Sequence, residues 1–244
     1  DTINSVVNQT FAATEIIVVD DCSTDKTVKI LKDLQKQVLN LRIYQVEQNF
    51  GGPAGPRNFG LAKANGTYLA FLDSDDLWHP MLLESYLQFY ECGISMLSST
   101  KLPFKDSKQF TCQEKWIEQS YKLSKIKTQR LTYKNLLNAN FIVNSSVFIK
   151  RSKFDEIRFE IDKKFIAVED FIAWCNVHKK FGPSLQLDLK MVGYRIDVNS
   201  LSSNKFSMLK KRIHALSYLG LSKIEICYRI ITFILIKLFG VQNV

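Results

Sequence analysis

Several residue patterns that mark common classes of protein are missing from this sequence. The five cysteines are odd in number and irregularly spaced, and no CxxC pair occurs, so neither a zinc ribbon nor a disulfide framework is indicated. A reducing compartment is the simpler interpretation. The three histidines have no metal-ligand spacing, and no Ser/His/Asp arrangement stands out. A secretory signal needs a basic start and an apolar run, and residues 1–4 (DTIN) provide neither.

What the sequence does contain is an ordinary globular composition with an uneven charge. Hydrophobic residues make up 46% of the 244 residues and charged residues 23%, which allows a sizeable core. The formal net charge is +9, and the stretch from Lys205 onward carries seven Lys or Arg and one acid, Glu225. A net +6 therefore belongs to the C-terminal tail and +3 to the rest.

The first third of the sequence alternates strand and helix patterns. Apolar runs at 15–19, 41–46 and 67–72 predict strands, and the first is the β-branched kind that is covered on both faces in parallel sheets. A helix is predicted over 25–38, and a short one over 61–64 follows a loop rich in glycine and proline. This order predicts an open α/β sheet with helices on both faces, in which ligands bind beyond the carboxyl ends of the strands.

The rest of the sequence is less regular. Residues 100–128 are polar and turn-rich, and we expect a loop there. The other elements that the pattern predicts are helices at 81–90 and 168–180 and strands at 143–149, 185–191 and 193–196.

Acidic residues follow two of the predicted strands. Asp20 and Asp21 come after the first, and Asp73, Asp75 and Asp76 come after the third. Solvated turns and helix caps would explain either group, since acids are common there. Alternatively, such carboxylates hold a divalent ion beside a nucleotide diphosphate, or accept hydrogen bonds from a base or ribose. Their placement at strand ends favours ligand binding.

Two further positions are candidates for chemistry. Arg57 lies in the glycine-rich segment 49–60, where a ligand can approach the backbone closely and a guanidinium can pair with phosphate. The alternative is a surface arginine in a turn. Asp170 follows Glu169 at the start of a predicted helix. It is either a general base for an acceptor hydroxyl or a charge that only favours the helix dipole.

Taken in order, these segments resemble the family 2 glycosyltransferases of GT-A fold, over about residues 1–203. The resemblance implies a Rossmann-like domain with a mixed, mainly parallel sheet, and a hexosyltransferase of the bacterial surface-polysaccharide type. The segments that carry it are SVVNQTF at 5–11, EIIVVDDCSTD at 15–25, the glycine-rich segment 49–60, GTYLAFLDSDDLWHP at 66–80, NSS at 144–146, VED at 168–170, YR at 194–195 and SLS at 200–202.

The resemblance implies roles at the donor site. Asp20 and Asp21 would include the carboxylate that meets the nucleobase. Asp73 would contact the ribose or the donor sugar, with Ser74 beside it in the same site. Asp75 would ligate Mn²⁺ or Mg²⁺ next to the diphosphate.

The resemblance also implies a mechanism. Arg57 would help to hold the donor, and Asp170 would match the catalytic base. A base of this kind implies a single in-line displacement with inversion at the anomeric carbon. UDP-sugars are the commonest donors of the family, so UDP is the default donor nucleotide.

Three features depart from the family pattern. The chain starts inside the family's first helix, without the opening central strand, so we expect the 244 residues alone to fold poorly and to need upstream residues for activity. Cys22 stands where glycine is usual. Asp197 stands where many relatives carry histidine, and no role is assigned to it.

The tail alternates basic clusters with apolar stretches, none of which is long enough to cross a bilayer. Arg229 and Lys237 lie off the apolar face of a helix drawn through it. This suits a helix that lies in a membrane surface and is drawn to anionic lipid, although a helix packed on the protein's own core would look similar. The apolar face consists of Ile224, Cys227, Ile231, Ile234, Leu235 and Leu238.

We expect a GT-A domain at 1–203, with a nucleotide-sugar half at 1–99 and an acceptor half at 100–203, followed by a basic amphipathic tail at 204–244. The expected activity is inverting transfer from a nucleotide-diphosphate sugar to a hydroxyl of a glycan or lipid-linked glycan, in surface polysaccharide or lipopolysaccharide synthesis. The expected place is the cytoplasm, peripherally on the inner face of the bacterial membrane, without a nucleic-acid partner. The alternatives are a polyprenyl-phosphate sugar transferase and a non-catalytic nucleotide-binding or membrane-docking protein.

Overall fold

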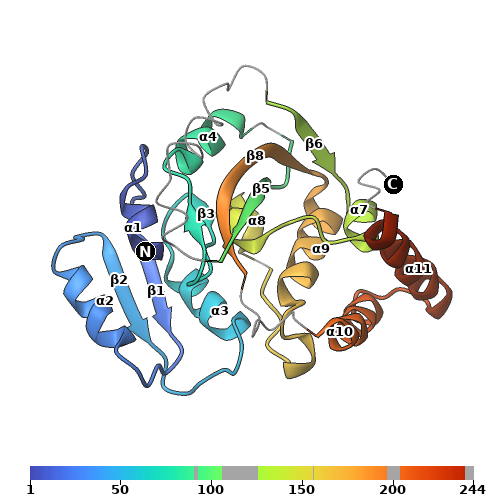
Figure 1. Cartoon of the computed structure of the whole chain (residues 1–244), viewed down its shortest axis with the longest axis horizontal. Helices are drawn as coiled ribbons and strands as arrows, with labels where there is room; N and C mark the ends of the chain where they lie inside the picture. The colour runs from blue at the N-terminus through green and yellow to red at the C-terminus, as the bar shows by residue number, and fades with distance from the viewer. Residues whose placement is uncertain (91–92, 106–125, 156, 197–203, 240–244) are drawn as a thin grey trace.

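The computed structural model describes residues 1–90, 93–105, 126–155, 157–196 and 204–239 (Figure 1). The N-terminal part contains α1 (Thr2–Val7), β1 (Ile16–Asp20), α2 (Thr27–Gln35), β2 (Leu41–Gln45), α3 (Ala54–Lys63), β3 (Tyr68–Ala70), β4 (Leu77–Trp78), α4 (Leu82–Phe89) and β5 (Leu97–Phe104). The C-terminal part contains β6 (Thr128–Leu131), α7 (Tyr133–Asn138), the 3₁₀ turn η2 (Asn144–Ser146), β7 (Phe148–Lys150), α8 (Arg151–Phe154), the 3₁₀ turn η3 (Lys163–Phe165), α9 (Glu169–Phe181), β8 (Ser184–Arg195), α10 (Lys205–Tyr218) and α11 (Lys223–Phe239).

The described strands form two sheets. β1 and β2 pair in parallel in a two-stranded sheet, with Ile16 opposite Leu41. The six-stranded sheet has the order β3-β7-β5-β8-β4, and β6 also pairs with β8. In it β5 and β8 run parallel, and the other described pairs are antiparallel. The α/β architecture with mixed sheets is confirmed, with more antiparallel pairing among the described strands than the sequence predicts.

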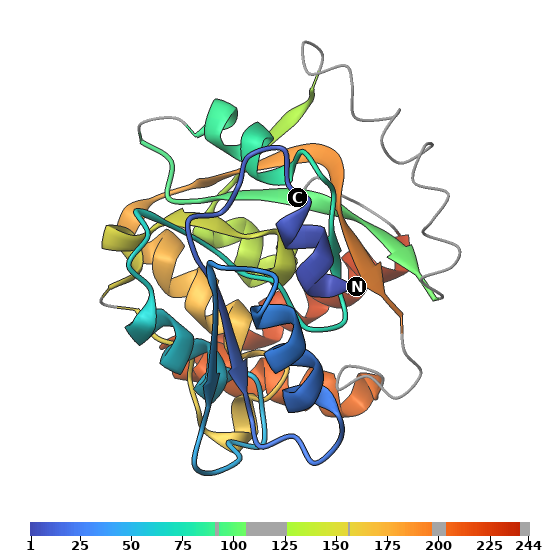
Figure 2. The same ribbon diagram turned by 90° about the vertical axis from the view of Figure 1, so that its left-hand side faces the viewer.

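Helices cover both faces of the six-stranded sheet. Phe148 and Ile149 are neighbours in β7, so their side chains point to opposite faces. Phe148 packs on Tyr86 of α4, whereas Ile149 belongs to the cluster around Trp174 of α9. The two-stranded sheet with α2 lies at one end of the molecule, and α10 and α11 lie at the other (Figures 1 and 2).

Four elements differ from the sequence-based prediction. The strand expected at 143–149 is the 3₁₀ turn η2 followed by the short strand β7, which begins only at Phe148. α3 begins at Ala54, inside the segment expected to be a loop, because Pro56 is in the first turn, where a missing N–H costs no helical hydrogen bond. β5 begins at Leu97 and overlaps the loop expected from residue 100, since pairing with β8 outweighs its weak local pattern. β8 is one strand instead of two, because Gly193 stays in the ladder opposite Leu77.

The C-terminal tail forms the two helices α10 and α11, with the turn between them at Gly220, whose φ is +89°. The prediction of amphipathic helices in this tail is therefore confirmed for residues 205–239. Across the described residues, no helix is both long enough and apolar enough to span a membrane. The rest of the expected loop (106–125), Asp197 and the segment 200–202 lie outside the described residues.

Candidate active site

The loop after β3 carries the acidic segment 73–76, and α1 ties down its backbone. The hydroxyl of Thr2 lies within hydrogen-bonding distance of two carbonyl oxygens of the loop, those of Ser74 (2.8 Å) and Asp76 (2.9 Å). From η2, the hydroxyl oxygen of Ser145 accepts the backbone N–H of Asp73 at 3.1 Å. These contacts place the loop before any ligand binds.

Asp76 is the buried member of this segment. Its Oδ2 accepts the Ser145 hydroxyl at 2.6 Å, and its Oδ1 accepts the backbone N–H of Arg195 at 3.0 Å. Burial raises the pKa of Asp76 to about 6; the charges of Asp73 and Asp75 add to the rise, and the two hydrogen bonds oppose it. Asp76 is 1% exposed, so it anchors the loop through neighbouring elements and does not present its carboxylate to a ligand.

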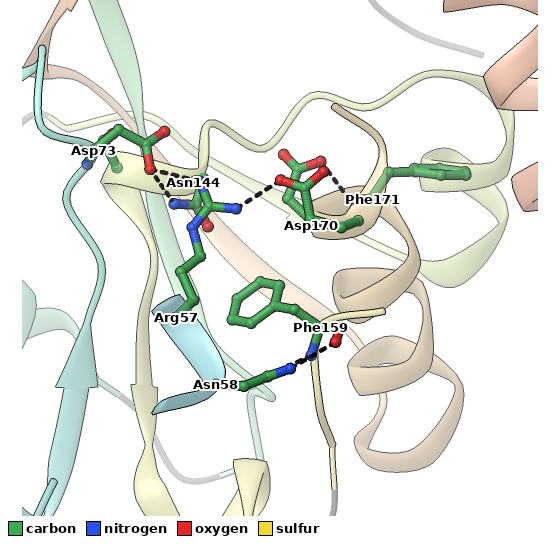
Figure 3. Close-up of polar contacts among 9 residues, drawn as sticks. Arg57, Asn58, Asp73, Asn144, Phe159, Asp170 and Phe171 are labelled. Atoms are coloured by element: carbon green, nitrogen blue, oxygen red, sulfur yellow. Dashed lines mark hydrogen bonds and ion pairs between the residues drawn. The ribbon is translucent and has the colours of Figure 1, made fainter. Parts of the chain in front are cut away.

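Arg57, on α3, connects the acidic loop to the start of α9 (Figure 3). Its Nη2 donates to Asp73 Oδ1 at 2.6 Å, and its Nη1 donates to Glu169 Oε1 at 2.7 Å. Asn144 of η2 donates its Nδ2 to the same Asp73 oxygen at 2.9 Å. Burial alone would lower the pKa of Arg57, but the charges of Asp73, Glu169 and Asp170 outweigh it, and the net pKa is raised. The guanidinium is therefore charged and shared between two carboxylates.

Asp170 lies in the first turn of α9, beside the Arg57 guanidinium (Figure 3). Its Oδ1 accepts the N–H of Phe171 at 2.6 Å. Burial raises the pKa of Asp170 to about 7; the charges of Glu169 and Asp73 add to the rise, and Arg57 opposes it. A carboxyl that titrates near neutrality is suited to accept a proton during a reaction.

The first acidic pair lies at the end of β1. Asp20 Oδ2 accepts the backbone N–H of Ser23 at 3.2 Å, and Asp21 Oδ1 accepts that of Phe50 at 2.9 Å. Cys22 follows with φ at +63°, a left-handed conformation that glycine adopts more easily than cysteine. This explains in physical terms why glycine is usual at the position and shows that the turn is formed with cysteine.

One cleft of about 1930 Å³ brings the predicted residues together. Its wall also contains Asn144, Lys101 and Tyr194, for which the sequence predicts no role. Asn144 and Tyr194 lie within the family-like segments 144–146 and 194–195, which is the only sequence signal for them; nothing in the sequence points to Lys101. The predicted site residues that line the cleft are Asp20, Asp21, Arg57, Asp73, Ser74, Asp75 and Asp170.

The carboxylates of the cleft set limits on a metal site. Asp75 is exposed and lines the cleft together with Asp73. Within the described part of the chain, no group of three or more His, Cys, Asp or Glu is arranged to hold a metal ion. These carboxylates would fit a Mg²⁺ or Mn²⁺ ion that has few protein ligands, and they do not fit an all-protein cage.

Sequence comparison identifies the class of protein that this fold and cleft define. The profile of "Glycosyl transferase family 2" matches residues 1–158. The chain therefore belongs to glycosyl transferase family 2 and is a glycosyltransferase, as its resemblance implies.

Two bacterial relatives are similar over most of their length. A Bacillus subtilis (strain 168) protein named for teichuronic acid biosynthesis, TuaG, is 32% identical over 214 residues, which is 86% of this chain and 79% of the relative. An Escherichia coli protein, UDP-Glc:α-D-GlcNAc-diphosphoundecaprenol β-1,3-glucosyltransferase WfaP, is 30% identical over 223 residues, which is 90% of this chain and 80% of the relative. These similarities confirm the prediction of a bacterial surface-polysaccharide type of glycosyltransferase.

Solved structures confirm the GT-A fold. The structure of Staphylococcus aureus TarS 1-349 in complex with UDP-GlcNAc aligns with a TM-score of 0.64 at 21% identity, over 96% of this chain and 66% of that one. The mannosyltransferase PcManGT from Pyrobaculum calidifontis, in complex with GDP-Man and Mn²⁺, aligns with a TM-score of 0.64 at 14% identity, over 98% of this chain and 66% of that one.

Proposed function

We propose that the chain is an inverting glycosyltransferase that moves a sugar from a nucleotide-diphosphate sugar, with UDP as the default nucleotide, to a hydroxyl of a glycan or lipid-linked glycan. The observation that carries the proposal is the placement of Asp170, whose pKa is raised by burial, in the same cleft as Asp73, Ser74 and Asp75. Arg57 connects the two by ion pairs to Asp73 and Glu169. A base and an acidic donor motif in one cleft are what hydroxyl transfer from a nucleotide sugar needs.

Asp170 is the base in this proposal. The acceptor oxygen forms a bond to the anomeric carbon while the bond from that carbon to the diphosphate oxygen breaks on the opposite face. The acceptor proton passes to the Asp170 carboxylate. Glu169 is the poorer candidate, because it is 3% exposed and its Oε1 is paired with Arg57 at 2.7 Å.

The donor side is assigned to the residues near the ends of β1 and β3. Asp20 and Asp21 would accept hydrogen bonds from the base or ribose, and Asp73 with Ser74 would contact the ribose or sugar. Asp75 would hold Mn²⁺ or Mg²⁺, which neutralises the charge of the departing diphosphate. The UDP-GlcNAc and GDP-Man complexes of the two structural neighbours support a nucleotide-sugar donor, and the Mn²⁺ of the second supports a divalent ion.

Two features favour a hydroxyl acceptor in surface-polysaccharide synthesis. A phosphate acceptor, as in polyprenyl-phosphate sugar transferases, needs no base, whereas the raised pKa of Asp170 favours a role as proton acceptor. The relative WfaP is named for transfer to a lipid-diphosphate-linked sugar. We keep the division of the cleft that the sequence predicts, with donor residues at 1–99 and the acceptor side at 100–203.

The test is transfer and donor binding by Asp170→Asn, measured separately. Asparagine keeps the size of the side chain and cannot take the proton, so transfer should fall roughly 10²- to 10⁴-fold while affinity for the donor nucleotide stays within about twofold. In the parent, the transfer rate should rise with pH through about 7, because the base acts when deprotonated. EDTA should stop transfer, and added Mn²⁺ should restore it.

The matched control is Asp33→Asn on the exposed surface of α2, which should leave both measurements unchanged. Undiminished transfer by Asp170→Asn would exclude Asp170 as the base. Retained nucleotide binding by the complete protein, with no transfer to any hydroxyl acceptor, would favour the non-catalytic alternative. Transfer that persists after chelation would contradict the metal assignment.

A further inference from the structure

The outer face of α11 is apolar and exposed. The sequence leaves open whether this face packs on the protein's own core, and the structure rules that out for the described residues. The buried positions of the helix, Thr232 and Ile236, lie on the other side. The exposed apolar residues are Ile224 (84%), Tyr228 (55%), Ile231 (58%), Ile234 (41%), Leu235 (47%) and Leu238 (71%).

The inner side of the tail is held by arginines. Arg229 donates to Asn138 Oδ1 at 2.5 Å, and Arg212 of α10 donates to the carbonyl oxygen of Leu137 at 2.8 Å, so both bind the C-terminal end of α7. Arg212 also lies over the Phe233 ring, 4.5 Å from its centroid. A surface helix in water normally buries its apolar residues and exposes its charged ones. α11 packs Ile226 and Ile230 on the core, but it also places Arg229 inward and leaves the apolar residues named above outward.

Lysines dominate the exposed charges of the described tail. Glu225, the only acid of the described tail, is used as a helix cap, since its Oε2 accepts the backbone N–H and the hydroxyl of Ser222. The exposed lysines of α10 and α11 are Lys205, Lys210, Lys223 and Lys237. An apolar helix face in a tail whose exposed charges are mostly lysines is complementary to a membrane surface with anionic headgroups.

We propose that the outer face of α11 is a docking surface for a bilayer that contains anionic lipid, with the helix lying in the plane of the headgroups. The docking does not require the proposed reaction. It does bear on the acceptor of that reaction, because Lys237 near the end of α11 lines the cleft together with Lys101, Tyr194 and Asp75. If the acceptor is lipid-linked, a docked α11 brings the cleft beside the surface that carries it; this second step rests on the proposed function.

The test is cosedimentation of the chain with vesicles, in the absence of donor and acceptor. Binding should be strong for vesicles of phosphatidylglycerol and phosphatidylcholine in equal parts, weak for pure phosphatidylcholine, and reduced by salt. The double variant Ile231→Ser, Leu235→Ser should lower partitioning about tenfold or more. Lys223→Gln with Lys237→Gln should lower it for the anionic vesicles alone.

The matched control is the double variant Ile30→Ser, Leu39→Ser, which removes two exposed apolar side chains at the α2 end of the molecule (56% and 98% exposed) and should bind as the parent does. Unchanged circular dichroism and melting temperature establish that each variant is folded. Equal binding by the parent and the α11 variant would overturn the proposal. So would a parent dimer in sedimentation velocity that the α11 variant dissociates, without vesicle binding, because the face would then join two copies of the chain.

Discussion

The two acidic groups of the cleft occupy similar places, each after a strand, yet they are held in different ways. Asp20 and Asp21 accept backbone N–H groups, from Ser23 and from Phe50. The 73–76 segment is held by side chains and backbone from α1, α3, η2 and β8. One group is fixed by turns close to its strand, and the other is fixed by contacts that span the whole fold.

This difference separates two kinds of site. Carboxylates fixed by backbone amides keep their position when distant side chains change, which suits recognition of a constant base or ribose. A loop whose charges are shared with Arg57 and Glu169 depends on the placement of α3 and α9. We infer that the second group couples donor binding to the position of the base, and the predictions below test that coupling.

The largest effect is expected from Arg57→Met, which removes the shared charge and leaves Glu169 and Asp73 without their partner. Glu169 is buried, so the free energy of unfolding should fall by about 3 kcal/mol, and transfer should fall roughly 100-fold. The pKa of Asp170 should rise further, because Arg57 is the charge that lowers it, and the pH midpoint of transfer should move above 7. Urea denaturation and a pH–rate profile measure these changes.

A second variant separates stability from function. Arg57→Met combined with Glu169→Gln removes the buried unpaired charge, so most of the lost stability should return while transfer stays low. If transfer returns together with stability, Arg57 acts only through folding.

Asp21→Asn provides the comparison in the first acidic group. Asparagine keeps an acceptor for the backbone N–H of Phe50, so the free energy of unfolding should change by less than about 1 kcal/mol.

A smaller effect is expected from Asp76→Asn. The pKa of Asp76 in the folded protein is about 6, above the ordinary 3.8, so between these values the folded state binds the proton more tightly than the unfolded state does. Stability should therefore fall as pH rises from about 4 to about 6, by on the order of 2–3 kcal/mol. Asparagine does not titrate and can still accept the Arg195 N–H, so this part of the pH dependence should disappear.

Urea denaturation from pH 4 to pH 7 measures the slope for parent and variant. An unchanged slope would show that another group, and not Asp76, is responsible for it. A variant that is much less stable at pH 7 would show that the carboxylate contributes more to holding the loop than its burial costs.

Local patterns in the sequence are sufficient to predict the acidic residues and the strands before them. Asp20, Asp21 and Asp73 follow apolar runs, and the position of a residue at a strand end is a local property. The apolar face of α11 is also predictable, because helical periodicity alone defines it. Which way that face points is decided by Arg212 and Arg229 binding α7, and no local pattern shows that contact.

The connections within the site are not predictable in the same way. Arg57 and Glu169 are 112 residues apart, and their pairing depends on where α3 and α9 pack. Asn144 and Ser145 lie in a segment that resembles the family, but nothing local shows that η2 places them against the acidic loop. β5 has a weak strand pattern because its partner β8, and not its own periodicity, stabilises it. Pairings between distant residues depend on the whole fold.

The smallest effect concerns two residues in the left-handed region. Cys22 follows Asp21 of the first acidic group with φ at +63°, and Ala167 lies just before α9, which carries Glu169 and Asp170, with φ at +72°. A residue with a Cβ is strained by about 1 kcal/mol or more in this conformation, and glycine removes that strain. Glycine also makes the unfolded chain more flexible, which cancels part of the added stability. Cys22→Gly and Ala167→Gly should each raise the free energy of unfolding by less than about 1 kcal/mol in urea denaturation.

The control is Cys22→Ala, which keeps the backbone strain and removes the hydrogen bond from the thiol to the Val46 carbonyl. This variant should be no more stable than the parent. If Cys22→Ala raises the free energy of unfolding as much as Cys22→Gly does, relief of backbone strain does not explain the effect of glycine. If transfer falls for Ala167→Gly but not for Cys22→Gly, the rigid turn before α9 positions the base, which is the coupling that distinguishes the second acidic group from the first.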